Sequence, residues 1–147
     1  MPILLALLGA ALAAPADLTA WSARTGLALS APARGATQQT PEGLALVGSG
    51  ESLLLADAKG DGALDAALAA MWAPFVEMGI ARPTPTDRAC MVAGRATTCR
   101  SATVQVAPGA ALHLLAGKPE GADWLLVCLD RDPARPGPCG THIGPAS

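Results

Sequence analysis

Two side chains of this sequence, Ser49 and His113, have the types that nucleophilic catalysis needs. Ser49 stands between two glycines in a tight turn, and His113 lies inside an apolar segment. A serine, a histidine and an orienting carboxylate together make a hydrolytic triad. In the G-x-S-x-G turn of hydrolases, however, glycines stand where this chain has Val47 and Glu51, and here the turn joins two strands. Ser49 and His113 are therefore candidates for catalysis, while the pattern favours a His113 that faces solvent or makes one hydrogen bond.

An acidic stretch ahead of a helical segment partly matches a calcium-binding loop. Asp57, Asp61 and Asp65 have the spacing of three oxygen ligands, and the glycine after Asp61 fits the sharp turn. Lys59, however, puts a positive charge where another ligand belongs, and Leu68 replaces the bidentate glutamate. The three aspartates are metal candidates, but the pattern favours a turn and a helix cap. We expect neither a metal nor a cofactor.

The four cysteines indicate disulfides, because their spacings form no paired C-x-x-C knuckles for zinc. A two-residue turn at Gly94-Arg95 would place Cys90 directly opposite Cys99. Paired Cα atoms of that kind lie about 4.5 Å apart, which a disulfide can span. The pairing Cys90–Cys99 leaves Cys128–Cys139 as the second bridge. Side-chain alternation along the strand that follows this turn predicts that the Cys90–Cys99 bridge lies on the more polar face of its sheet.

The stapled hairpin carries two arginines, Arg95 in its turn and Arg100 on its second arm. A rigid tip loses little conformational entropy when it binds a partner. We therefore expect Arg95 and Arg100 to contact a protein or a small-molecule partner, whose identity the sequence does not give.

The first sixteen residues have the features of an export signal. Residues 3–14 are an apolar run that is too short for a bilayer, which takes about 20 residues, and A-x-A patterns follow. We predict a signal peptide over 1–16, cleaved after Ala13 or after Ala16, and a periplasmic or extracellular mature chain without a membrane span. No lysine or arginine precedes the apolar run, so a buried N-terminal helix is the alternative.

Composition limits the classes of partner. The 147 residues carry a formal net charge of −2, which argues against a general nucleic-acid binder. Usage rich in alanine, arginine, glycine and proline is typical of a GC-rich bacterial genome. Aromatic residues are scarce, so we expect each of them in the core: Trp21, Trp72, Phe75 and Trp124.

Hydrophobic patterning predicts an α+β fold in a single domain over 17–147. One main amphipathic helix, with its apolar face between Leu64 and Phe75, would pack against an antiparallel sheet of hairpins and a meander, and Pro74 would kink or end this helix near Ala73. The remaining expected elements are a strand over 17–30, a hairpin of 44–47 with 52–56, a run of strands from 90 to 129, and a Pro/Gly-rich tail over 130–147.

No convergent set of reactive side chains is evident, so binding is expected rather than catalysis. The sequence favours an exported, disulfide-stapled, non-catalytic interaction module. The alternatives are a small secreted hydrolase that uses Ser49 and His113, and a calcium-dependent binding domain built on residues 57–65.

Overall fold

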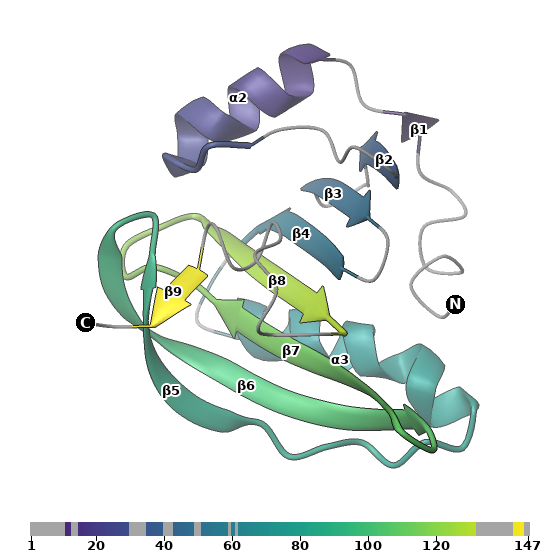
Figure 1. The fold of residues 1–147 in the computed structure, drawn as a ribbon. Coiled ribbons are helices and arrows are strands. Elements are labelled where there is room, and N and C mark those ends of the chain that lie inside the picture. Colours follow the sequence, from purple (N-terminus) through teal and green to yellow (C-terminus); the bar gives the residue numbers. More distant parts are fainter. Residues whose placement is uncertain are drawn as a thin grey trace.

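A computed structural model of the chain describes residues 11–12, 15–29, 35–39, 43–48, 51–58, 60, 62–131 and 143–145. These residues form one antiparallel sheet with a helix on each of its faces (Figure 1). Among them, no helix combines the length and the apolar character that crossing a membrane requires.

The described part of the sheet has nine strands in the order β1-β2-β3-β4-β8-β7-β6-β5-β9. The seven strands from β2 to β8 have five residues or more, whereas β1 and β9 add two and three residues at the edges. The predicted hairpin of 44–47 with 52–56 is confirmed as β3 with β4, and the predicted run of strands from 90 to 129 corresponds to β5, β6, β7 and β8. The bounds are β1 Ala11–Leu12, β2 Gly35–Gln39, β3 Gly43–Gly48, β4 Glu51–Asp57, β5 Thr86–Val92, β6 Arg95–Ala107, β7 Ala110–Gly117, β8 Trp124–Asp130 and β9 Ile143–Pro145.

Two helices cover this sheet, so the predicted fold of one main helix on a sheet with two disulfides is wrong. Helix α2 (Pro15–Thr25) packs on one face and helix α3 (Ala63–Glu77) on the other. Of the two predicted disulfides, only Cys90–Cys99 has both of its cysteines among the described residues. Cys139 lies outside them, so Cys128–Cys139 stays a prediction.

The central strands explain why both faces need a helix. Every residue of β8 is buried, and its side chains alternate between two apolar clusters. The same alternation places Leu53 and Leu55 of β4 on the α2 side, and Leu54 and Ala56 on the α3 side. A sheet that is apolar on both faces is stable in water only when both are covered.

Helix α2 replaces the strand that was predicted over 17–30. Leu18 and Trp21 are three residues apart, and both pack against the cluster on their side of the sheet. Thr25 closes the last turn by donating its hydroxyl to the Trp21 carbonyl at 2.7 Å. The segment then returns along the same cluster through Leu27 and Leu29. The apolar residues thus follow the helical period up to Thr25 and an extended path after it.

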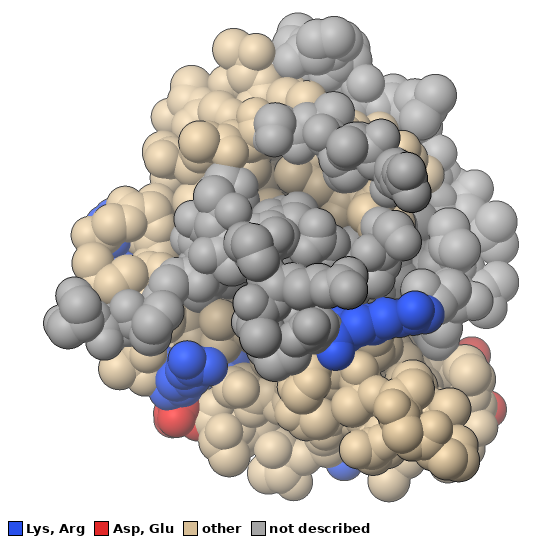
Figure 2. Space-filling view, in the orientation of Figure 1, with Lys and Arg blue, Asp and Glu red and all other residues tan. Residues whose placement is uncertain are grey.

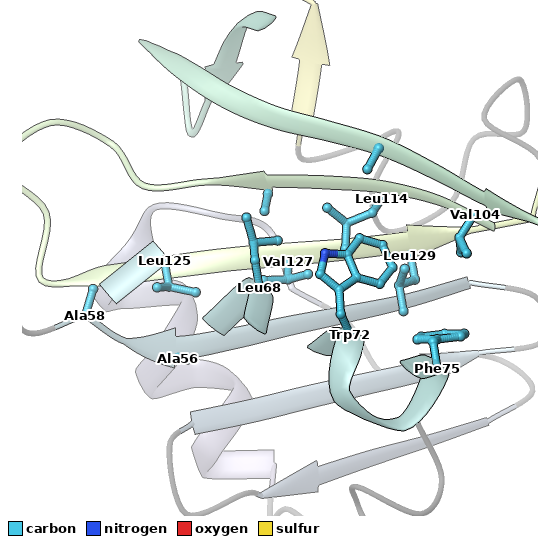
Figure 3. Close-up of a cluster of buried hydrophobic side chains, with 12 residues drawn as sticks. Ala56, Ala58, Leu68, Trp72, Phe75, Val104, Leu114, Leu125, Val127 and Leu129 are labelled. Atoms are coloured by element: carbon cyan, nitrogen blue, oxygen red, sulfur yellow. The ribbon is translucent and has the colours of Figure 1, made fainter. Parts of the chain in front are cut away.

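Helix α3 confirms the predicted apolar face. Leu68, Trp72 and Phe75 are buried among small and aliphatic side chains of the sheet (Figure 3). The Trp72 and Phe75 rings meet edge to face, with centroids 5.8 Å apart. Of the two effects predicted for Pro74, the helix end is wrong, because the helix continues to Glu77 with Pro74 inside it.

The β5–β6 hairpin turns one residue earlier than predicted. Its turn is Ala93-Gly94, both residues have positive φ (52° and 75°), and Val92 pairs with Arg95. Two positive φ angles are the signature of the type I′ turn, whose twist matches that of the paired strands. Cys90 therefore pairs with Thr97, two positions away from Cys99, and the disulfide is diagonal with a Cα–Cα distance of 5.9 Å.

The same disulfide lies on the buried face of the sheet, not on the predicted polar face. Cys90 and Cys99 are only 1% and 0% exposed and belong to the cluster that α2 covers. The register does not cause this difference, because Cys90, Cys99 and Val92 share one face of the hairpin in the predicted and in the observed pairing. The prediction lacked α2, which covers the cluster that contains the bridge. The bridge is therefore part of the core.

Candidate functional site

The hairpin tip with Arg95 is fixed against the loop between β7 and β8. Arg95 donates from Nη2 to the Glu120 carbonyl at 2.6 Å, and the Thr97 hydroxyl donates to the Lys118 carbonyl at 3.0 Å. Arg95 itself is exposed. A guanidinium has five N–H donors in a planar fork, so most of its donors are still directed toward solvent or a ligand.

Arg100 joins helix α3 to the second arm of the hairpin. Its Nη1 lies 2.7 Å from Asp65 Oδ1, and its Nε lies 3.7 Å from Asp87 Oδ1. The three side chains are partly exposed, so water screens these ion pairs and each contributes little to stability. With two carboxylates already beside it, Arg100 is less suited than Arg95 to hold an anionic partner.

The contacts of Arg24 in α2 were not predicted from the sequence. Its guanidinium donates to Asp57 Oδ1 at 2.6 Å and to the Asp123 carbonyl at 2.9 Å, and it lies 4.5 Å from the centre of the Trp21 ring. Desolvation lowers the pKa of Arg24, but the hydrogen bond and the charge of Asp57, together with Asp123, outweigh it and raise the pKa. Arg24 therefore stays charged and ties α2 to the sheet.

Two of the three candidate calcium ligands lie in ion pairs. Asp57 is paired with Arg24 and Asp65 with Arg100, while Asp61 lies outside the described residues. Within the described part of the chain, no three His, Cys, Asp or Glu side chains gather closely enough to hold a metal ion. A cation at this loop would have to displace two arginines from the carboxylates.

His113 occupies the middle of a polar row across the sheet, which the predicted strand boundaries did not reveal. It pairs with Thr103 of β6 on one side and with Asp130 of β8 on the other. Thr103 Oγ1 and His113 Nδ1 lie 3.1 Å apart, and Asp130 is buried. Ser49, the candidate nucleophile, lies outside the described residues. On β4, the residue paired with Asp130 is Glu51.

Charged side chains do not single out another site on the face that Figure 2 shows. Lys and Arg side chains stand there at separate positions, with few Asp and Glu side chains among them. The described residues on this face form no continuous charged patch. The hairpin tip and the His113 row are therefore the two candidate sites.

Comparison with known protein families, with curated proteins and with solved structures found no match for this chain. The assignment of a function therefore depends on the chain's own residues.

Proposed function

We propose that the chain is an exported, periplasmic or extracellular, non-catalytic binding module. The signal-like first sixteen residues support export, and so does the buried disulfide, because such bridges form in oxidising compartments. The bridge lies in the middle of the core, where it fixes the hairpin that carries Arg95.

The observation that carries the binding proposal is the position of Arg95. Its guanidinium is exposed, yet one of its donors is already held by the Glu120 carbonyl. Such a side chain is oriented before a partner arrives and loses little rotamer freedom on binding. A planar guanidinium suits carboxylate or phosphate, so we propose that the tip binds an anionic group of its partner.

The test compares two arginine variants of the exported protein, immobilised and incubated with the extract of the same compartment. Arg95→Ala should lower the affinity for the retained partner by about tenfold or more, as expected for the loss of a charge-assisted hydrogen bond. Arg82→Ala removes an exposed arginine outside the hairpin and should retain the partner. Equal retention by wild type and Arg95→Ala would contradict the proposed site.

A hydrolase is the second candidate, favoured by the 3.1 Å contact between Thr103 and His113 and by the buried Asp130 beside them in register. A histidine between a hydroxyl and a carboxylate is the arrangement that activates a nucleophile. A fluorophosphonate that labels the wild type but neither His113→Ala nor one of the two hydroxyl variants, Ser49→Ala and Thr103→Ala, would establish this function and identify the nucleophile. The absence of labelling would leave binding as the function.

A further inference from the structure

The outer edge of β2 is covered by a strand that export would remove. The two residues of β1, Ala11–Leu12, pair with Gln38 and Gln39 of β2. Both predicted cleavage positions, after Ala13 and after Ala16, lie beyond β1 in the chain. Signal cleavage would therefore separate β1 from the sheet and leave the backbone groups along this edge of β2 without their strand.

The sequence of β2 lacks the residues that prevent an edge strand from pairing with another chain. Its residues Gly35-Ala36-Thr37-Gln38-Gln39 include no charge and no proline. At the opposite side of the sheet, β9 covers only Cys90 to Val92 of β5, and the part of β5 that β9 leaves uncovered carries Asp87 and Arg88 and follows two prolines closely. Charges and prolines on edge strands prevent pairing with other chains, so β2 has the composition of a strand that pairs.

Two unpartnered polar atoms lie on the same strand. Within the described residues, three buried side-chain nitrogen or oxygen atoms make no hydrogen bond, namely Thr37 Oγ1, Gln38 Oε1 and Trp72 Nε1. Native proteins leave few buried polar groups unsatisfied. Two of the three belong to neighbouring residues of β2, whose side chains point to opposite faces of the sheet, so each face of this strand has an acceptor without a donor.

Resting on the export proposed above, we propose that the mature chain forms a homodimer through antiparallel pairing of β2 with β2 of a second copy. Pairing about Thr37 places the two Thr37 side chains opposite each other and Ala36 opposite Gln38. Threonine pairs hydrogen-bond across strands, and each glutamine amide has donors for the acceptors that lack one. The uncharged strand meets itself without repulsion, and a two-fold axis makes both copies equivalent.

The test begins with the full-length chain, isolated from the exported fraction after processing. Mass spectrometry identifies the mature N-terminus, and light scattering after size exclusion gives the molar mass, which we expect to be that of a dimer. Thr37→Lys places two like charges against each other at the axis, so the mass should fall by half. Thr86→Lys puts the same change on β5, at an exposed position, and should leave the dimer intact.

A charge-swap experiment separates pairing from misfolding. Thr37→Glu alone should also be monomeric, whereas an equimolar mixture of Thr37→Lys with Thr37→Glu should recover the dimer, because opposite charges then face each other across the axis. Thermal unfolding of each variant checks that the monomers are folded.

The outcomes distinguish this dimer from the proposed export. A processed wild-type chain that is monomeric overturns the dimer and leaves export standing. An unprocessed chain overturns both, since β1 would stay on β2. A dimer that Thr37→Lys leaves intact, or a mixture that stays monomeric, shows pairing through another surface and overturns the proposal.

Discussion

Gly117 lies directly opposite Cys99 and leaves the space that the disulfide occupies. A Cβ atom on this glycine would stand 2.8 Å from Cys99 Sγ and 3.4 Å from Val92 Cγ2. Both neighbours are fully buried, and the sulfur is bonded to Cys90, so neither can move away freely. Close approach, and not an unusual backbone angle, is what requires glycine here.

We expect Gly117→Ala to lower the free energy of unfolding by about 1–3 kcal/mol, the usual cost of forcing an extra carbon into a packed core. Urea denaturation of the oxidised protein measures this difference.

The matched control is Gly117→Ala in a chain that also carries Cys90→Ala and Cys99→Ala. Without the sulfurs the added methyl has room, so the same substitution should cost clearly less, and the difference is the coupling energy of a double-mutant cycle. Equal costs in both chains would mean that the sulfur is not what excludes a side chain at this position.

For the β5–β6 hairpin, the sequence predicted which two cysteines form the disulfide but not the register of the two strands. Cys90 and Cys99 are close enough in any short hairpin to be paired, so their bond was predictable. The rule that glycine comes first in a two-residue turn put Gly94 in the wrong place, because Ala93 adopts a positive φ that alanine rarely takes. The error turned a diagonal bridge into a directly opposed pair, whereas the wrong face was assigned because α2 was not predicted.

The C-terminal turn of helix α2 is attached to the sheet through the side chain of Arg24. Besides the apolar contacts of Leu18 and Trp21, its C-terminal turn is held by Arg24, which reaches Asp57 at the end of β4 and Asp123 before β8. These contacts are partly exposed, so they secure the end of the helix more than they stabilise the whole protein.

Arg24→Gln should therefore loosen α2 locally. We expect faster hydrogen exchange at the amides of α2 and a loss of about 0.5–1 kcal/mol in the free energy of unfolding. Hydrogen exchange measured by mass spectrometry reports on the helix, and chemical denaturation reports on the total stability.

Arg82→Gln changes an exposed arginine of the connector after α3 and serves as the control. It should leave the exchange of α2 unchanged. If Arg24→Gln exchanged at the wild-type rate, the apolar contacts alone would be holding the helix.

Elements with one strong period were predictable from the sequence, and those with a mixed pattern were not. Leu68, Trp72 and Phe75 repeat at helical spacing without interruption, so α3 was predicted with its buried face. In the segment of α2, Leu18 and Trp21 follow the helical period, whereas Leu27 and Leu29 alternate as in an extended chain. Averaging the two patterns suggested a strand.

In the whole molecule, the sheet is a layer between two helices. One segment of the sequence indicated this arrangement. The run from Trp124 to Asp130 is buried throughout, as expected of a strand that is covered on both faces. One predicted helix covers one face only, so the prediction left half of these side chains without cover. The polar row of His113 required the register of four strands, which local patterns do not give.

The depth of the Cys90–Cys99 bridge also constrains the order of events during biogenesis. An oxidant makes a disulfide by direct contact with a thiolate, and these two sulfurs are 1% and 0% exposed once the sheet and α2 are in place. The thiols must therefore meet their oxidant while the hairpin is still open to solvent. Oxidation of the two cysteines therefore has to precede the packing of the sheet and α2 around them. Once the protein is folded, a reductant cannot contact the buried bond.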